Sequence, residues 1–353
     1  MTLRTPPARH ERALAAVEAV EAAEPWLPTA QEPVAMVAGD RIIARSDLPE
    51  WARTMLPSPW RHLWDPQDPG LEPITATSGA QVIVRAKYDL SDGVKLRAAY
   101  EDPHVIVGVL PHAPFGSCGV TRTVRAHAVV GRFAPDLIPP LVTFGEVGPA
   151  GRYVVERWVD GRPLMTPSRL ADALPQVIDG LTHVHDGYGI SEMRLSRWAP
   201  RLAKDWATLA DSGLVPADLH RQVTALIDRD AALRASWTHG DPVASNVIRA
   251  VDGGIVLVDW ENARHAPVMV DAAKLHVFAA HPDATLEQVL RGLGGRTSGR
   301  PGYSPAEELA LAHARTLAGH PRRVARLVGH AREARELDQA ARRVERLAAT
   351  LAA

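Results

Sequence analysis

The pattern of hydrophobic and polar residues changes twice along the chain and divides it into three parts. Between residues 76 and 160, short β-branched segments alternate with turn residues, which is typical of antiparallel strands. This pattern predicts five strands, with one helix between the third and the fourth. The strands are expected at 81–90, 94–100, 104–110, 141–144 and 153–159, and the helix at 120–133. We therefore predict a small five-stranded antiparallel α+β lobe here.

From residue 161 onward the hydrophobic residues follow a helical period. Amphipathic segments predict helices at 170–185, 198–211, 217–233 and 322–351. A further helix is expected to begin at Pro305, because Ser304 and Glu307 have the spacing of a capping box. Two short apolar strands interrupt the helices. We predict a mostly helical lobe that runs to the end of the chain.

The first 75 residues have neither pattern along most of their length. Residues 8–23 are Ala-rich and amphipathic and predict a helix. Many prolines follow, together with Trp26, Trp51, Trp60 and Trp64. We expect irregular structure whose large rings pack against a lobe, since such rings are normally buried. The predicted organisation is an N-terminal extension (1–75), a nucleotide-binding small lobe (76–160) and a helical lobe (161–353).

Composition narrows the classes of partner. The formal net charge of −1 over 353 residues argues against general binding to nucleic acid or to an anionic membrane. No apolar run approaches the roughly 18–20 residues of a membrane span, and the N-terminus lacks a signal-peptide pattern. Cys118 is the only cysteine, which excludes an intramolecular disulfide. We expect a cytoplasmic protein without a membrane or nucleic-acid partner.

The candidate chemistry lies in two short segments of the helical lobe. A His-Gly-Asp sequence ends at Asp241, Asn246 follows five residues later, and Asp259 ends an apolar strand eighteen residues after Asp241. Gly253 and Gly254 separate two apolar strands, so a two-stranded ribbon would bring Asn246 and Asp259 back beside Asp241. One carboxylate can orient an incoming hydroxyl, while an amide oxygen and a second carboxylate can hold Mg²⁺. The spacing indicates the acceptor side of a phosphoryl-transfer site.

The sequence His-Gly-Asp-x4-Asn, followed by apolar-Asp-Trp-Glu, resembles the catalytic and metal loops of the aminoglycoside phosphotransferase and choline kinase family. The resemblance extends from about residue 80 to about residue 285. It implies a protein-kinase-like fold of two lobes, with ATP and Mg²⁺ as cofactors. It also implies that Asp241 is the catalytic base and that Asn246 and Asp259 are metal ligands. Glu261 has two open interpretations: it contacts the metal through water, or it faces solvent.

Other segments extend the resemblance. His239 is expected to hold the catalytic loop through hydrogen bonds, because that position is structural in the family. Residues 152–164 look like the family's hinge, so Glu156 and Trp158 are expected to bind the nucleotide, with backbone groups around Trp158 hydrogen-bonding the adenine. Asp271 is expected to be the N-cap of a helix and to brace the catalytic loop.

The small lobe departs from the family pattern. In the family, a Lys on the third strand grips the nucleotide phosphates and a Glu on the next helix holds that Lys. The expected third strand (104–110) contains no Lys, and the helix at 120–133 contains no Glu. Lys87 and Lys95 are the only lysines of this lobe, so these or a nearby Arg are the candidate phosphate contacts. In an alternative register with an earlier strand, Lys95 becomes the third-strand lysine itself.

The leading hypothesis is an ATP- and Mg²⁺-dependent phosphotransferase that transfers the γ-phosphoryl group to a hydroxyl of a small molecule or peptide. Acidic and basic side chains are balanced between residues 165 and 235, so the sequence does not favour a cationic aminoglycoside over a neutral acceptor. One alternative is a Ser/Thr kinase of a precursor peptide in natural-product biosynthesis, with the N-terminal extension as a surface for a protein partner. Another is a pseudokinase-like binding protein, because the Lys–Glu pair is missing.

Overall fold

The chain forms two compact units. One contains residues 1–128 and 139–159, and the other contains residues 129–138 and 160–353. The computed structural model describes residues 7–29, 36–38, 42–44, 50–53, 55, 78–85, 96–110, 118–148, 151–210, 212–294, 302–327 and 333–353. None of the helices in these ranges has the length and apolar composition of a membrane-spanning segment.

The first unit is built on one antiparallel sheet with the order β1-β2-β3-β4-β5-β7-β6. Its strands are β1 (Met36–Ala38), β2 (Ile42–Ala44), β3 (Val82–Arg85), β4 (Leu96–Tyr100), β5 (Val105–Leu110), β6 (Leu141–Val147) and β7 (Gly151–Arg157). The five predicted strands correspond to β3–β7, and the predicted helix is α4 (Gly119–Phe133). The sheet has seven strands rather than five, because β1 and β2 add to its edge. Each is only three residues long, too short to produce a recognisable period in the sequence.

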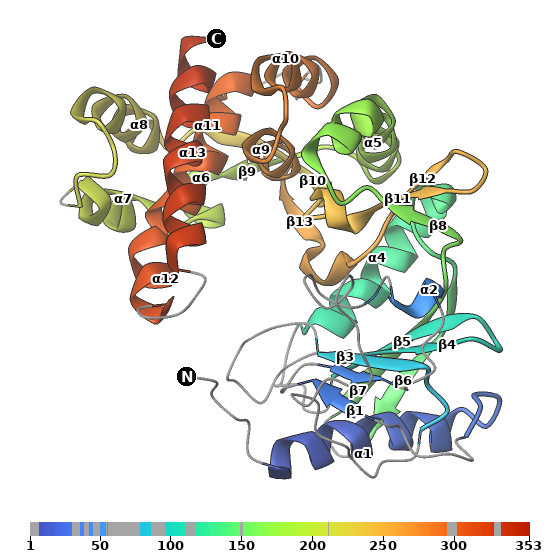
Figure 1. The fold of residues 1–353 in the computed structure, drawn as a ribbon. Coiled ribbons are helices and arrows are strands. Elements are labelled where there is room, and N and C mark those ends of the chain that lie inside the picture. Colours follow the sequence, from blue (N-terminus) through green and yellow to red (C-terminus); the bar gives the residue numbers. More distant parts are fainter. Residues whose placement is uncertain are drawn as a thin grey trace. The chain divides into compact units, whose positions relative to one another are not determined.

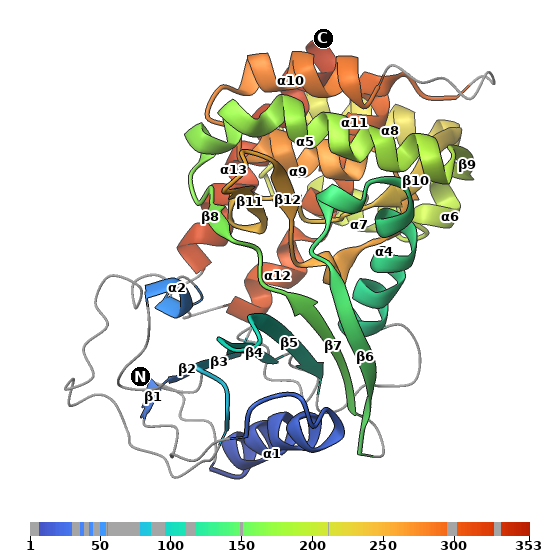
Figure 2. The same ribbon diagram turned by 90° about the vertical axis from the view of Figure 1, so that its right-hand side faces the viewer.

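The N-terminal helix α1 (Pro7–Ala23) packs on this sheet, as both Figure 1 and Figure 2 show. Val17 and Val20 of α1 are fully buried in a hydrophobic cluster with side chains of β3, β4, β5 and β7. Glu21 of the same helix is buried and accepts hydrogen bonds from the hydroxyls of Ser78 (2.6 Å) and Tyr100 (2.9 Å). Burial, with Glu21 nearby, raises the pKa of Tyr100, so its hydroxyl stays protonated and serves as a donor. The helix is therefore part of the core of this unit.

The second unit is mostly helical. Its helices are α5 (Pro167–Tyr188), α6 (Leu195–Trp198), α7 (Leu202–Ala210), α8 (Ala217–Arg229), α9 (Met269–Val277), α10 (Pro282–Gly292), α11 (Pro305–Ala318), α12 (His320–Leu327) and α13 (Glu333–Ala352). Helix α11 contacts α7, α8, α9 and α13, and α13 runs beside it in Figure 1. The predicted capping box at its start is confirmed: the Glu307 amide donates to Ser304 Oγ (3.2 Å), and the Ser304 amide donates to Glu307 (2.7 Å). The single helix predicted at 322–351 is wrong, since α12 and α13 are separate helices.

Two three-stranded sheets lie among these helices, in the orders β13-β10-β9 and β12-β11-β8. Their strands are β8 (Gly161–Pro163), β9 (Ser191–Arg194), β10 (Ala232–Thr238), β11 (Val247–Ala250), β12 (Ile255–Leu257) and β13 (Arg264–Pro267). The helix predicted at 217–233 ends earlier, at Arg229, because Asp230 adopts the left-handed conformation (φ 38°, ψ 47°). The chain then enters β10, which leads into the candidate site.

Candidate active site

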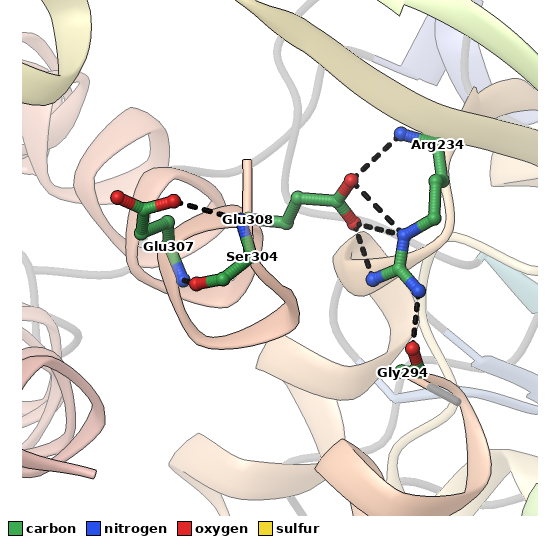
Figure 3. A network of polar contacts seen from close by, with 5 residues as sticks. All are labelled: Arg234, Gly294, Ser304, Glu307 and Glu308. Atoms are coloured by element: carbon green, nitrogen blue, oxygen red, sulfur yellow. Dashed lines mark hydrogen bonds and ion pairs between the residues drawn. The ribbon is translucent and has the colours of Figure 1, made fainter. Parts of the chain in front are cut away.

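Strand β10 is buried and leads directly into the catalytic loop, which contains His239, Gly240 and Asp241. It is the central strand of its sheet, and six of its seven residues are buried. An ion pair ties it to α11: Arg234 (6% exposed) donates through Nε and Nη2 to the carboxylate of Glu308 (1% exposed), at 2.8–3.1 Å (Figure 3). The Arg234 amide donates to the same carboxylate (2.8 Å), and Nη1 donates to the carbonyl of Gly294. Both the backbone and the side chain of Arg234 in β10 are thereby bonded to Glu308 of α11.

Gly240 makes the sharp turn between β10 and Asp241. Its φ is +84°, a value that a residue with a side chain rarely adopts. A Cβ at this position would lie 2.7 Å from the carbonyl oxygen of Asn262. The glycine of the His-Gly-Asp sequence is therefore required both by its backbone conformation and by the lack of space.

His239 links the catalytic loop to the loop that carries Asp259. Its ring is fully buried, with Nδ1 accepting from the Asp241 amide (3.2 Å) and Nε2 donating to the Val258 carbonyl (3.0 Å). Its ring also lies against Trp260, with centroids 4.4 Å apart. Burial lowers the pKa of His239, which favours the neutral ring that this pair of hydrogen bonds needs. The predicted loop-holding hydrogen bonds of His239 are confirmed.

Asp271 fixes the backbone on the other side of the loop. Its two carboxylate oxygens accept from the amides of His239 (2.8 Å) and Gly240 (2.7 Å). Burial raises its pKa to about 6. The predicted bracing contact is confirmed, but the predicted N-cap role is wrong. The N-cap of α9 is Val268, and Asp271 lies in the first turn, so its side chain points to the catalytic loop and does not cap its own helix.

Strands β11 and β12 form the predicted ribbon, which brings the backbone of Asn246 beside the residue that precedes Asp259. The register pairs Val247 with Leu257, and the Val258 amide donates to the Asn246 carbonyl (2.9 Å). The side-chain Nδ2 of Asn246 donates to the carbonyl of Asp241 (3.0 Å). Asp259 follows directly, in the left-handed conformation (φ 67°, ψ 51°). Non-glycine residues in this region are uncommon and often functional.

The donor set fits Mg²⁺ better than a transition metal. Because Nδ2 of Asn246 donates to the Asp241 carbonyl, the Oδ1 atom of Asn246 points in another direction. The Ser245 hydroxyl lies 3.5 Å from this Oδ1 atom. One amide oxygen and the Asp259 carboxylate suit Mg²⁺, which keeps several waters and takes further ligands from phosphates. No group of three or more His, Cys, Asp or Glu side chains suited to a metal occurs within the described residues.

Glu261 is only 7% exposed, so the interpretation in which it faces solvent is wrong.

Lys274 is a residue of this site that the sequence analysis missed. Its Nζ lies 2.9 Å from Oδ1 of Asp241. The available signal was its rarity: lysine occurs at only four positions, and one of them is three residues after Asp271. Thirty-three residues separate Lys274 from Asp241, however, and no short motif links such distant positions.

The residues predicted to bind the nucleotide lie in the other unit. Glu156 on β7 pairs with Nε2 of His127 on α4 (2.8 Å). Trp158 stacks on His104, with ring centroids 5.3 Å apart, and meets Trp51 edge-on at 5.0 Å. The Trp158 amide donates to the His104 carbonyl (3.0 Å), so this hinge amide already has a partner. The two candidate phosphate lysines, Lys87 and Lys95, lie outside the described residues.

The fold and this loop geometry define a kinase-like phosphotransferase, and comparison with known families agrees. Residues 121–309, more than half of the chain, match the model of the phosphotransferase enzyme family (APH). The chain therefore belongs to this family, whose reaction is the transfer of a phosphoryl group to a hydroxyl acceptor. The family resemblance noted in the sequence is confirmed.

Solved structures support the predicted fold. The spectinomycin phosphotransferase APH(9)-Ia, in complex with ADP and spectinomycin, shares 12% identity with a TM-score of 0.53, and the match covers 77% of this chain and 94% of that one. Choline kinase LicA from Streptococcus pneumoniae shares 15% identity with a TM-score of 0.51, covering 76% and 93%. At these identities the likeness concerns the fold alone, and it confirms the protein-kinase-like α+β class. No curated protein sequence matches the chain significantly.

Proposed function

We propose that this protein is an ATP- and Mg²⁺-dependent phosphotransferase in which Asp241 is the catalytic base and Asn246 and Asp259 bind the metal. The observation that carries the proposal is the joining of the two loops. His239 bridges the Asp241 amide and the Val258 carbonyl, and Asn246 hydrogen-bonds the Asp241 carbonyl. These contacts hold the carboxylate of Asp241 in a fixed position relative to the proposed metal ligands Asn246 and Asp259. Phosphoryl transfer requires such fixed positions on its acceptor side.

In the proposed reaction, Asp241 accepts a hydrogen bond from the acceptor hydroxyl and orients its oxygen toward the γ-phosphorus. A bond forms between that oxygen and phosphorus, the bond to the ADP oxygen breaks, and the hydroxyl proton passes to Asp241. When bound at Asn246 and Asp259, Mg²⁺ supplies charge compensation for the phosphate oxygens. The buried hydrogen bonds of His239 and Asp271 keep the loop in place during the transfer.

For the nucleotide side, we propose that the hinge segment containing Glu156 and Trp158 binds the adenine. The carboxylate of Glu156 pairs with His127, and the Trp158 amide donates to the His104 carbonyl. Adenine binding would therefore rely on other backbone groups of the segment. Lys87 and Lys95 stay the candidate phosphate contacts. The pseudokinase alternative is disfavoured, since the base and both metal ligands are present together.

The proposal is tested with labelled ATP and a panel of hydroxyl acceptors: choline, spectinomycin, aminoglycosides, macrolides, neutral alcohols, and Ser- and Thr-containing peptides. Wild-type protein should phosphorylate at least one acceptor class. Asp241→Asn should lower turnover by roughly 10²–10⁴-fold, the contribution of a general base. Asp283→Asn, at an exposed carboxylate in the first turn of α10, is the matched control and should retain activity.

Full activity in Asp241→Asn would refute the assignment of the base. Phosphorylation of the peptides alone would instead establish the precursor-peptide alternative.

A further inference from the structure

Lys274 of α9 is placed against the catalytic carboxylate. Its Nζ lies 2.9 Å from Oδ1 of Asp241, and the two side chains are 31% and 29% exposed. The pair is therefore half-buried, and part of each side chain remains accessible to solvent. Because solvent still reaches both side chains, the ion pair contributes little to stability, and stability is a weak explanation for its presence.

The helix fixes where the Lys274 ammonium lies. Asp271 and Lys274 are three residues apart and share one face of α9. Asp271 accepts hydrogen bonds from the backbone of the catalytic loop, while Lys274 contacts the side chain of Asp241 in the same loop. Helix α9 is itself anchored in the core, with Met269 and Leu275 no more than 1% exposed. The cation thus has a defined position relative to Asp241.

The choice of lysine is unusual for this chain. Lys and Arg total 40, of which only four are Lys, and most ion pairs among the other described residues of this unit use Arg, as in Arg291–Glu287 and Arg342–Asp338. An arginine presents its five N–H donors in one fixed plane, a geometry that suits bidentate pairing. A lysine presents three N–H donors around a point charge, so it can bind Asp241 with one and another anion with the next. The chemistry of Lys274 therefore suits a second anionic partner.

A phosphoryl group is the anion expected there. A hydroxyl bound to Asp241 has its oxygen about 2.6–3.2 Å from the carboxylate, and the phosphorus that this oxygen attacks lies immediately beyond. Without a cation, the charge of Asp241 would repel the phosphate oxygens. The ammonium of Lys274, 2.9 Å from the Asp241 carboxylate, would offset this repulsion.

We propose that Lys274 is a catalytic residue that binds the transferred phosphoryl group while holding Asp241 in place. This inference rests on the proposed function and adds a residue to it. In the transfer, the acceptor oxygen bonds to phosphorus, the bond to ADP breaks and the proton goes to Asp241. Lys274 keeps all of its protons and donates hydrogen bonds to Asp241 and to a phosphoryl oxygen throughout.

The test compares the affinities of a non-hydrolysable β,γ-imido ATP analogue and of ADP, each with Mg²⁺, by calorimetry. Lys274→Met, which keeps an apolar stem and removes the charge, should weaken binding of the analogue by roughly 10- to 100-fold and leave ADP within about threefold. Lys274→Arg should recover part of the loss. Lys204→Met, at an exposed lysine of α7 in the same unit, should change neither affinity.

A double variant separates phosphate binding from simple neutralisation of Asp241. If Lys274 contacts the phosphoryl group, Lys274→Met should still weaken the analogue in an Asp241→Asn background. Disappearance of the effect in that background, or an equal effect on analogue and ADP, would overturn the proposal. The melting temperature of Lys274→Met should stay within about 3 °C of wild type; if that variant does not fold, Lys274→Gln takes its place.

The outcomes distinguish the inference from the proposed function. Wild-type protein that binds the analogue, together with a Lys274→Met variant that binds it equally well, would refute only the role of Lys274. Wild-type protein that binds neither nucleotide would refute the ATP-dependent function and this inference with it. Where an acceptor is known, Lys274→Met should also lower kcat by roughly 10²–10³-fold with a much smaller change in the acceptor KM.

Discussion

Asp271 and His239 hold the catalytic loop from opposite sides through buried polar contacts. Asp271 accepts two backbone hydrogen bonds with both carboxylate oxygens and is fully buried. Because burial disfavours its charged form, its pKa rises from 3.8 to about 6. The carboxylate that holds the loop therefore titrates within a range that experiments reach easily.

The titration of Asp271 predicts a pH-dependent difference in stability. Between about pH 4 and pH 6 the folded chain retains a proton on this carboxyl that the unfolded chain loses, so its contribution to the unfolding free energy falls as pH rises. Asp271→Asn removes this titration. The unfolding free energy of wild type minus that of Asp271→Asn should fall by roughly 2–3 kcal/mol between about pH 4 and pH 7. Denaturant titrations at several pH values measure it.

Asp283→Asn is the control for loss of a carboxylate, because Asp283 is exposed. The difference in unfolding free energy between wild type and Asp283→Asn should vary much less over the same pH range. A flat or rising difference for Asp271→Asn would mean that burial does not control this carboxyl.

At the level of single residues, the sequence predicted the placement of residues that belong to one local motif, while their catalytic and metal-binding roles stay predictions. The ribbon forms and Asn246 hydrogen-bonds Asp241, because the local spacing contains both the turn and the two strands. Lys274 was not predicted, because its contact depends on how α9 packs against the loop. The N-cap role of Asp271 was predicted wrongly for a similar reason: a carboxylate near a helix start can bind its own helix or a neighbouring loop, and only the packing decides.

At the level of elements, the position of the site depends on how β10 is anchored. The buried pair of Arg234 and Glu308 ties this strand to α11 (Figure 3). Seven residues after Arg234, the chain reaches Asp241. A displacement of β10 would therefore move the catalytic loop directly.

Breaking this buried pair should be costly. Glu308→Gln preserves the size of the side chain but leaves the guanidinium of Arg234 buried without a counter-charge. The unfolding free energy should fall by roughly 3–5 kcal/mol, as for other buried pairs that lose one partner. Thermal or chemical denaturation of the purified variant measures the loss.

The adjacent Glu307 provides a matched control, since it makes an accessible pair with Arg229 and completes the capping box with Ser304. Glu307→Gln should cost no more than about 1–2 kcal/mol. Equal losses in the two variants would show that the Arg234 pair does not anchor the strand.

Most long elements could be predicted from the sequence, whereas several short ones could not. The helical periods of α1, α4, α5 and α8, and the glycine turn between β11 and β12, are local signals. Strands β1, β2, β8, β9 and β13 are three or four residues long, and β8, β9 and β13 pair with strands that are distant in sequence. Their pairing is a tertiary property that periodicity does not contain. The division of 322–351 into α12 and α13 was missed because the stripe of apolar residues continues across the break.

At the level of the whole molecule, the residues proposed for catalysis and those proposed for nucleotide binding belong to different units. Asp241, Asn246, Asp259 and Lys274 are all in the second unit, within the part of the chain that matches the family model. Glu156 and Trp158 are in the first unit. The central claim therefore concerns the second unit: its loops bind Mg²⁺ together with the nucleotide phosphates.

The most direct test of this claim is a calorimetric titration of the protein with ATP, with Mg²⁺ and with a chelator, in wild type and in Asp259→Asn. Asparagine is the chosen replacement because it tolerates the left-handed conformation of Asp259. We predict that wild type binds ATP in a Mg²⁺-dependent manner, that Asp259→Asn weakens this binding by about 10- to 100-fold or more, and that Asp283→Asn leaves it unchanged. Binding that is the same with the chelator and with Mg²⁺, or that is unaffected by Asp259→Asn, would contradict the account.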